Sequence, residues 1–184
     1  TGVWEQMGTN GTPLPDFMGY NMKWGSAISL SGDGNTLAIG AGDNSSYSDE
    51  VRVFTWNPST DGIVTNGTWY YEAHFPQTDS NDGTGYSVSL NNDGTIIAIG
   101  RVNYNSQMGR VSIFNKTGNQ LGQGLSPGQG SGWTLSQTIS GSNQQDYFGF
   151  SVSLSADGTV VAIGAPYFDL SLIHISEPTR LRRI

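Results

Sequence analysis

Cysteine is missing from the sequence, and charged side chains are scarce. Without cysteine the chain forms neither disulfides nor thiolate metal sites. Charged residues make up 12% of the 184 residues, about half of the roughly 25% that is usual in soluble domains. No apolar run approaches the roughly 20 residues that span a bilayer. The formal charge of −7 offers no basic surface to phosphates. We therefore expect no membrane span in this chain and no nucleic-acid partner.

Glycine, in contrast, is abundant. It accounts for 26 of the 184 residues, about twice its usual share of roughly 7%. Glycine and asparagine tolerate the positive φ values that tight turns require, whereas glycine, serine, threonine and asparagine are weak helix formers. The composition therefore predicts an all-β chain of many short strands joined by turns.

The last fifteen residues differ in character from the rest of the chain. Residues 170–180 resemble the translation of the transposase-end adapter used in DNA library preparation. We interpret residues 170–184 as adapter-derived, with a genuine basic tail as the alternative, and expect the natural protein to continue past Asp169. Without this tail, five basic and fourteen acidic residues remain, a net charge of −9, and His74 is the only histidine.

An internal repeat dominates the remaining sequence. Three stretches of sixteen residues align without gaps, and their starts are 60 and 64 residues apart. They are residues 25–40, 85–100 and 149–164. A tryptophan precedes each stretch at a similar distance, at Trp4, Trp69 and Trp133. Self-similarity at a period of this length is the signature of a repeat architecture.

Each stretch predicts two strands joined by a tight turn. In the third copy, residues 151–155 alternate in polarity with period two, Asp157-Gly158 follows, and residues 159–163 form a second apolar run. Asp-Gly between two such runs favours a two-residue type I′ turn, in which both central residues have positive φ. Asp33-Gly34 and Asp93-Gly94 repeat the pattern, so we predict the same hairpin in all three copies.

Two further strands complete each unit. Apolar alternation at residues 51–54 and 111–114 predicts a third strand, and the tryptophan segments predict a fourth. Strict alternation would place the apolar residues of each tryptophan segment on one face. These sets are Trp69, Tyr71, Ala73 and Phe75 in one copy, and Trp133, Leu135, Gln137 and Ile139 in the next.

The repeat unit predicts a sheet that is covered on both faces. Residues 96–99 are apolar at consecutive positions, as in strands buried on both sides. A four-stranded sheet stacked between copies of itself is a β-propeller blade. We expect two complete antiparallel four-stranded blades, from residues 25–75 and 85–139, flanked by a strand at Trp4 and a hairpin at 149–164. Two alternative folds are less favoured: a parallel β-helix, because its repeats are shorter, and a stacked sandwich, because it needs no strict period.

One family shares these features. The segment Phe148-Gly149-Phe-Ser-Val-Ser-Leu, followed by Val161-Ala-Ile-Gly-Ala-Pro166, resembles the FG-GAP repeat of integrin α-chain propellers. The resemblance covers residues 4–166, and the first two copies depart from it. Trp24-Gly25 and Thr84-Gly85 replace Phe-Gly, and Gly40-Ala-Gly42 and Gly100-Arg-Val102 replace Gly-Ala-Pro. Because such propellers usually close with seven blades, the resemblance implies a propeller fragment of about two and a half blades.

The resemblance also raises the question of calcium, for which oxygen ligands must converge. The three Asp-Gly turns each offer one carboxylate, so a structural turn explains them without a metal. Asp79 and Asp82 precede the second repeat, and Asp146 holds the place of Asp82 before the third. These three are the calcium candidates, although an aspartate that bonds backbone N–H groups in a loop is the simpler explanation. We expect no other cofactor.

No local cluster predicts catalysis. A Ser-His-Asp arrangement would depend on His74 alone, and His74 is out of phase with the apolar face of its segment, so that it would point to solvent or to an adjacent blade. The loops at 41–50, 57–68, 101–109 and 115–132 differ between repeats, and surface loops on a rigid scaffold are where binding usually resides. Tyr47 and Tyr104 occupy equivalent loops and are the candidates for contacting a ligand.

Together these features favour a non-catalytic recognition, adhesion or scaffold module of an extracellular or cell-surface protein. Its partner would be a protein or glycan ligand bound through the loops between strands. The main alternative is a fragment of a propeller enzyme, a hydrolase or lyase, whose active site lies in other blades. An intracellular scaffold of the WD-repeat type also remains open.

Overall fold

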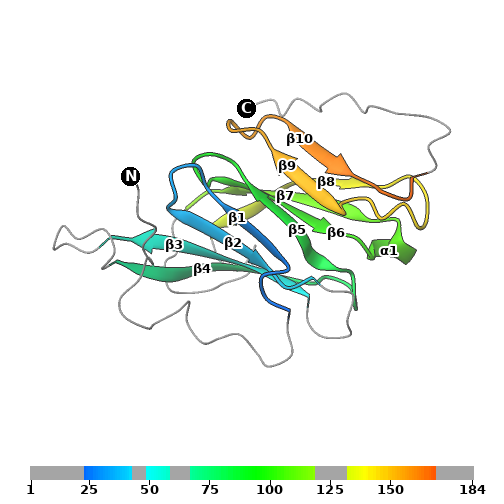
Figure 1. Cartoon of the computed structure of the whole chain (residues 1–184), viewed down its shortest axis with the longest axis horizontal. Coiled ribbons are helices and arrows are strands. Elements are labelled where there is room, and N and C mark those ends of the chain that lie inside the picture. Colours follow the sequence, from blue (N-terminus) through cyan, green and yellow to red (C-terminus); the bar gives the residue numbers. More distant parts are fainter. Residues whose placement is uncertain (1–22, 43–48, 59–66, 119–131, 169–184) are drawn as a thin grey trace, which may run out of the picture.

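The computed structural model describes residues 23–42, 49–58, 67–118 and 132–168. The described chain is all-β, with two four-stranded antiparallel sheets and one two-stranded hairpin (Figure 1). The first sheet contains β1 (Ala27–Leu30), β2 (Thr36–Gly40), β3 (Glu50–Asn57) and β4 (Thr68–Pro76), in that order. The second contains β5 (Thr84–Leu90), β6 (Ile96–Arg101), β7 (Arg110–Lys116) and β8 (Trp133–Ser140). The hairpin pairs β9 (Ser151–Leu154) with β10 (Val161–Gly164).

This arrangement confirms the predicted strands of the two repeats and the third hairpin. Each sheet follows the order of the sequence, as consecutive antiparallel strands with short connections do. Among the described residues the only helix is α1 (Tyr104–Gln107), and Asn105 and Ser106 inside it have positive φ values of 50° and 57°. No helix in this part of the chain is long and apolar enough to cross a membrane. The predicted strand at Trp4 and the tail at 170–184 lie outside the described residues.

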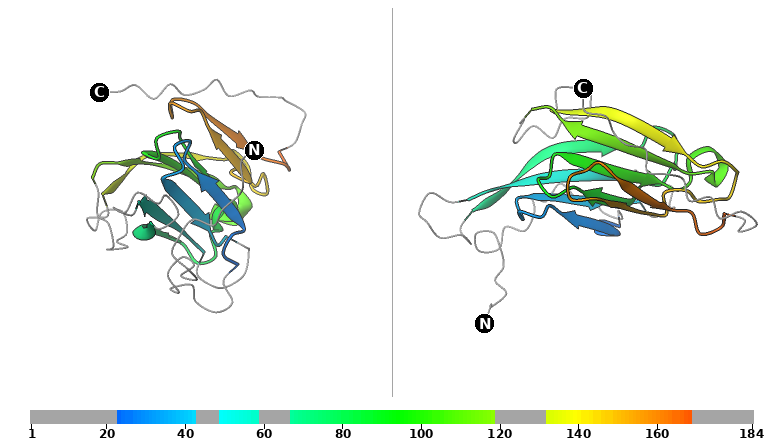
Figure 2. Two further views of the ribbon diagram at one scale, coloured as in Figure 1. Left: turned by 60° about the vertical axis from the view of Figure 1, so that its left-hand side comes forward. Right: turned by 90° about the horizontal axis from the view of Figure 1, so that it is seen from above.

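The three units stack face to face, and two apolar clusters fill the spaces between them (Figure 2). The first cluster joins the first sheet to the second and includes Val53, Phe75, Ile97, Phe114 and Trp133. The second joins the opposite face of the second sheet to the hairpin and includes Ala98, Val111, Ile113, Val152 and Ile163. Strands β5, β6 and β7 of the second sheet are therefore largely buried on both faces, as the consecutive apolar residues of β6 predict, whereas β8 is mostly exposed.

The first strands of the three units lie next to one another, β1 beside β5 and β5 beside β9 (Figure 1). We call these two contacts the first and second seam. At the first seam the Leu90 N–H donates to Ser29 Oγ at 2.9 Å, and at the second the Leu154 N–H donates to Ser89 Oγ at 2.9 Å. Because Ser29 and Ser89 occupy equivalent repeat positions, as do Leu90 and Leu154, the second seam repeats the first.

Glycines allow the backbones to approach closely at both seams. A Cβ on Gly40 would lie 2.2 Å from the carbonyl oxygen of Gly85, and a Cβ on Gly100 would lie 2.2 Å from that of Gly149. Contacts this short do not occur for real side chains, so only glycine fits at the two equivalent positions.

The Asp-Gly hairpins form as predicted, but the predicted turn type is wrong. In the first copy the Gly34 N–H donates to the Ser31 carbonyl at 2.9 Å, and the Ser31 N–H donates to the Thr36 carbonyl at 2.9 Å. The loop thus contains four residues rather than two, with Gly34 at φ 74° and Asp33 at negative φ. A four-residue loop needs only one residue of positive φ, and glycine supplies it in each copy.

The predicted faces of the fourth strands are also wrong, because each fourth strand contains a β-bulge. Val53 pairs with Ala73 and Phe54 pairs with Tyr71, so that Glu72 has no partner across the ladder. The second sheet repeats this irregularity, with Ser136 as the extra residue. An extra residue reverses the phase of the alternation. Tyr71 therefore lies on the other face of the sheet from Ala73 and Phe75. Its ring packs on the ring of Phe54, with 5.5 Å between the two centroids.

Candidate functional site

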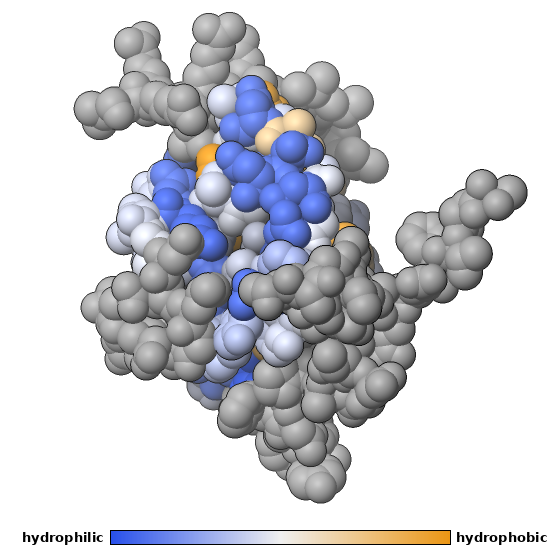
Figure 3. Space-filling view, turned by 90° about the vertical axis from the view of Figure 1, so that its left-hand side faces the viewer, coloured by the Kyte–Doolittle hydropathy of each residue, from blue (hydrophilic) through white to orange (hydrophobic). Residues whose placement is uncertain are grey.

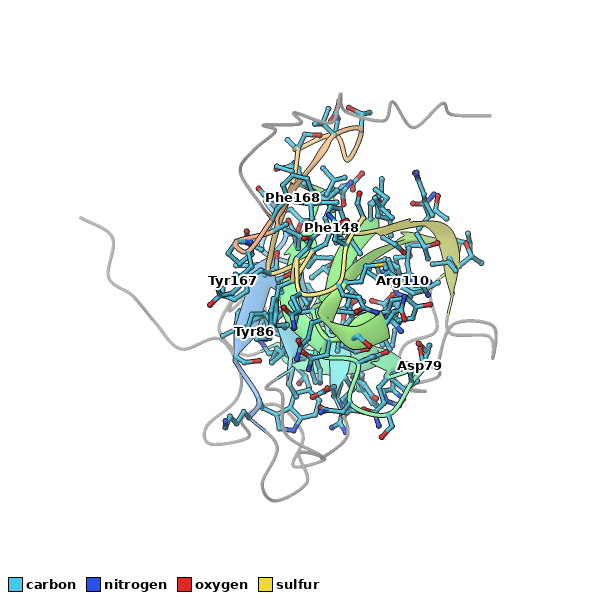
Figure 4. All side chains as sticks on the ribbon, turned by 90° about the vertical axis from the view of Figure 1, so that its right-hand side faces the viewer. Asp79, Tyr86, Arg110, Phe148, Tyr167 and Phe168 are labelled. Atoms are coloured by element: carbon cyan, nitrogen blue, oxygen red, sulfur yellow. The ribbon has the colours of Figure 1, made fainter. Side chains whose placement is uncertain are left out.

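Three connections meet at one end of the stack, which we call the loop end. They join β4 to β5 (residues 77–83), β6 to β7 (102–109) and β8 to β9 (141–150). Backbone hydrogen bonds hold them together, among them Asn103 N to Asp82 O at 3.1 Å and Tyr147 N to Gln107 O at 2.9 Å. Figure 4 looks onto this end. At the opposite end, the described surface over the hairpin turns is mainly hydrophilic (Figure 3).

Asp82 organises the connection between β4 and β5. It is 1% exposed, and its carboxylate accepts hydrogen bonds from the backbone N–H groups of Thr78 and Thr84 at 3.0 and 2.9 Å and from both threonine hydroxyls. The guanidinium of Arg101, on β6, donates to the same carboxylate at 3.1 Å. Burial of the charged guanidinium is the main cause that lowers the pKa of Arg101, and the Asp82 carboxylate opposes this shift.

The two other calcium candidates lie in similar loops. Asp146 is buried and accepts hydrogen bonds from the backbone N–H and the side-chain amide of Asn143, at 2.9 and 3.3 Å. Asp79 is exposed, and its N–H donates to Asp82 at 3.4 Å. Within the described residues no three acidic or histidine side chains gather where they could hold a metal ion. The loop-closing role expected of Asp82 and Asp146 is present, and calcium binding stays a prediction.

Of the two ligand-loop tyrosines, Tyr104 is placed at the loop end, and Tyr47 lies outside the described residues. The Arg110 guanidinium lies 3.5 Å from the centre of the Tyr104 ring and donates through Nε to Ser140 Oγ at 3.3 Å. The ring of Tyr104 therefore already has a cation stacked on it. In Figure 4, Arg110 and Asp79 lie on the same side of this end.

A cavity of about 300 Å³ opens between the fourth strand of the first sheet and the outer strands of the second. Its apolar wall comes from Phe75 and Pro76 of β4, Phe114 of β7 and Leu135 of β8. Arg101 and Arg110 line it as well. Leu135 is 55% exposed because the bulge at Ser136 turns it toward the first sheet, where the outer strands stand apart.

Aromatic side chains form a second feature of the loop end. Tyr86 and Phe150, which directly follow the repeat glycines, lie 5.0 Å apart between ring centroids. Tyr147 and Tyr167 form a second pair at 5.1 Å. Phe150 is 41% and Tyr167 69% exposed. We call these four residues the aromatic patch; in Figure 4 its members Tyr86 and Tyr167 lie on the side away from Arg110. The sequence analysis did not identify this patch, although Tyr86 and Phe150 hold equivalent repeat positions.

His74 lies on the face of the first sheet that points away from the second. Its Nε2 is 2.5 Å from the Glu50 carboxylate, and Glu50 also pairs with Arg52 at 2.7 Å. Arg52 in turn stacks on Trp24 at 4.5 Å. His74 is therefore part of an ion-pair group on a sheet face, separate from the cavity and the aromatic patch.

No family model matches the sequence, and a search of curated proteins finds no similar one. The likeness to FG-GAP repeats therefore depends on the residues quoted above.

Proposed function

We propose that the chain is a segment of a β-propeller of the FG-GAP type. Two features support this: strands β5 to β7 of the second sheet are largely buried on both faces by its neighbours, and the two seams repeat the same hydrogen bond from a leucine N–H to a serine hydroxyl. The first strands touch while a cavity opens between the outer strands, and radial packing of blades around an axis would produce such a wedge.

The function that we propose is non-catalytic recognition of a protein or glycan ligand, in an extracellular or cell-surface protein. The observation that carries it is the aromatic patch. Exposed aromatic rings that pack on a neighbouring ring present large contact areas at little cost in conformational entropy, and tyrosine adds a hydroxyl for hydrogen bonding. Phe150 and Tyr167 have these properties at the loop end.

Binding of the chain, at concentrations below the onset of its self-association, to an array of oligosaccharides and an array of peptides tests this function. We expect discrete ligands to be retained, and the single variants Phe150→Ala and Tyr167→Ala to reduce their binding at least tenfold. Tyr70→Ala is the matched control, because Tyr70 is 39% exposed on β4, away from the loop end. Equal losses in all three variants, or no retained ligand, would contradict the proposal.

A further inference from the structure

The cavity between the sheets contains more positive than negative charge. Arg101 is neutralised by Asp82, but among the described residues Arg110 has no carboxylate partner. The charge of Arg110 also acts against that of Arg101, and lowers its pKa, while exposed Asp79 has a smaller opposite effect. An excess cation at one cavity is notable in a chain of net charge −7. An anion bound there would offset the repulsion between the two guanidinium groups.

A second, independent observation comes from the hydrogen bonds of Arg101. Its side chain is 5% exposed, and Nη1 donates to Asp82 and to Thr78. Its Nε–H is buried and has no hydrogen-bond partner. Buried donors are nearly always paired, because an unpaired N–H loses its bonds to water without replacement. Arg101 therefore lines the cavity with one donor unpaired behind the wall, and Arg110 is the arginine without a carboxylate partner among the described residues.

The remaining walls determine which anion fits. Leu135, Pro76, Phe75 and Phe114 form the apolar part of the wall, and Thr78, Ser112 and Thr138 complete it. Inorganic anions would leave this apolar surface without a contact. The planar guanidinium fork matches a carboxylate in particular, with two parallel N–H donors.

We propose that this cavity binds the carboxyl terminus of a peptide whose last residue is aliphatic or aromatic, with the carboxylate on Arg110 and Arg101 and the side chain on Leu135. The volume of about 300 Å³ is at the small end for ligand pockets, which suits one terminal residue. Of the hydroxyls that border the cavity, those of Ser112 and Thr138 are then the ones left for the peptide backbone, since Thr78 already bonds Asp82 and Arg101. This site is separate from the aromatic patch, so either can exist without the other.

Titration with N-acetyl-L-leucine, followed by calorimetry or by the NMR signal of the Arg110 Nε–H, tests the proposal. The neutral N-acetyl-L-leucinamide has the same side chain without the charge, and we expect it to bind at least tenfold more weakly. Arg110→Gln should weaken N-acetyl-L-leucine binding by at least tenfold, and Arg110→Lys by less, since it keeps the charge and loses the fork. Leu135→Ser should weaken binding of the leucine compound more than binding of acetate.

Two controls separate this site from a general charge effect and from the proposed function. Lys23→Gln removes one exposed cation elsewhere and should leave binding unchanged, as should Tyr167→Ala in the aromatic patch. Circular dichroism verifies that each variant is folded. Equal affinity for the acid and the amide would overturn the proposal, and so would full binding by Arg110→Gln. Tighter binding of glucuronate than of N-acetyl-L-leucine would assign the cavity to an acidic sugar and overturn the peptide assignment.

Discussion

Two side chains at equivalent positions close each hairpin turn. In the first copy the Ser31 hydroxyl donates to Asp33 at 2.6 Å and accepts from the Thr36 N–H at 2.9 Å. In the third copy Ser155 makes the same two bonds, to Asp157 at 2.6 Å and from Val160 at 3.0 Å. In the second copy Asn91 accepts from the Ile96 N–H through its amide oxygen at 2.9 Å. These bonds satisfy the turn without a metal ion.

Asp157 should titrate well below an ordinary aspartate. The hydrogen bond from the Ser155 hydroxyl has the largest effect on its pKa. Together with the bonds from Thr159, it lowers this pKa from 3.8 to about 2. Because the folded-state pKa is the lower one, the stability that these bonds add is present above pH 4 and is lost as the pH falls from about 4 toward 2. Carboxyl-carbon NMR measures this pKa directly. Ser155→Ala should raise it toward 3.8, and an unchanged value in that variant would contradict the explanation.

Gly100→Ala should destabilise the fold. The new Cβ would lie 2.2 Å from both the Gly149 carbonyl oxygen and Ser87 Oγ, so that the second seam must open. Forcing an extra carbon into such a contact costs roughly 1–3 kcal/mol. Gly118→Ala is the control, because among the described residues the nearest atom to its Cβ, outside the adjacent residues, is Gly132 Cα at 3.8 Å. Urea unfolding of both variants measures the difference, and equal midpoints would show that the seam is not tight.

At the scale of elements, the bulge in β4 places a buried carboxylate between the two sheets. Glu72 is fully buried and accepts hydrogen bonds from Trp133 Nε1 at 3.1 Å and from the Thr55 hydroxyl. Lys116 Nζ lies 2.8 Å from the same carboxylate. Trp133 is the repeat tryptophan of the second copy, so the bulge of one sheet binds the tryptophan of the next.

Glu72→Ala should therefore weaken the contact between the sheets. It leaves the Lys116 ammonium and the Trp133 N–H without their acceptor, and removing one member of a buried ion pair costs roughly 3–5 kcal/mol. Urea unfolding, followed by circular dichroism, measures the loss. The double variant Glu72→Met with Lys116→Met removes both charges and should recover much of the stability. A double variant less stable than Glu72→Ala would contradict this account.

The strands could be predicted from the sequence because their signal is local and occurs three times. The bulges could not, since Glu72 and Ser136 differ in type and nothing in an alternating run marks an extra residue. The turn type could not be predicted for a related reason, since Asp-Gly occurs in both two-residue and four-residue loops. The backbone N–H groups that donate to Ser31 and to Asn91 decide between the two. The face of the sheet on which each side chain of a fourth strand lies therefore cannot be read from the alternation of that strand alone.

The candidate site could be predicted only in part, because it also depends on contacts between sheets. The loop-closing role of Asp82 follows from its place before the repeat glycine. The cavity at Arg101 and Arg110 arises where the outer strands of two sheets separate. It is lined by Leu135, which the bulge at Ser136 places on the other face of the sheet from Gln137 and Ile139, contrary to strict alternation. The sequence of either repeat alone does not show which side chains of two repeats meet at this cavity.

At the scale of the whole molecule, the two outer faces of the stack differ. On β1, Ile28 and Leu30 are 64% and 55% exposed. On β9, Ser151 and Ser153 are exposed. Leu30 holds the repeat position of the leucines that donate at the two seams, and Ser153 holds that of the serines that accept. The two outer faces therefore present the two halves of one seam.

We predict that the chain alone associates with itself or is partly unfolded. Exposed sheet faces and strand edges promote aggregation, and repeat units without neighbours lose the contacts that stabilise them. Thermal unfolding with light scattering should show early scattering, and Leu30→Lys should delay it. Tyr70→Lys, on the exposed part of β4, should not. A monomeric chain with one sharp transition would indicate that the units do not depend on covered faces.

The seam has a direction, since a serine on one side always meets a leucine N–H on the other. A gene that gains a copy of this repeat therefore gains both halves of the contact in a single duplication, and the new unit fits its neighbours without further mutation. Later sequence changes are then restricted most at the glycines and serines of the seams, and least at the loop end. There Tyr86, Phe150 and Arg110 can diverge from copy to copy while the stack persists.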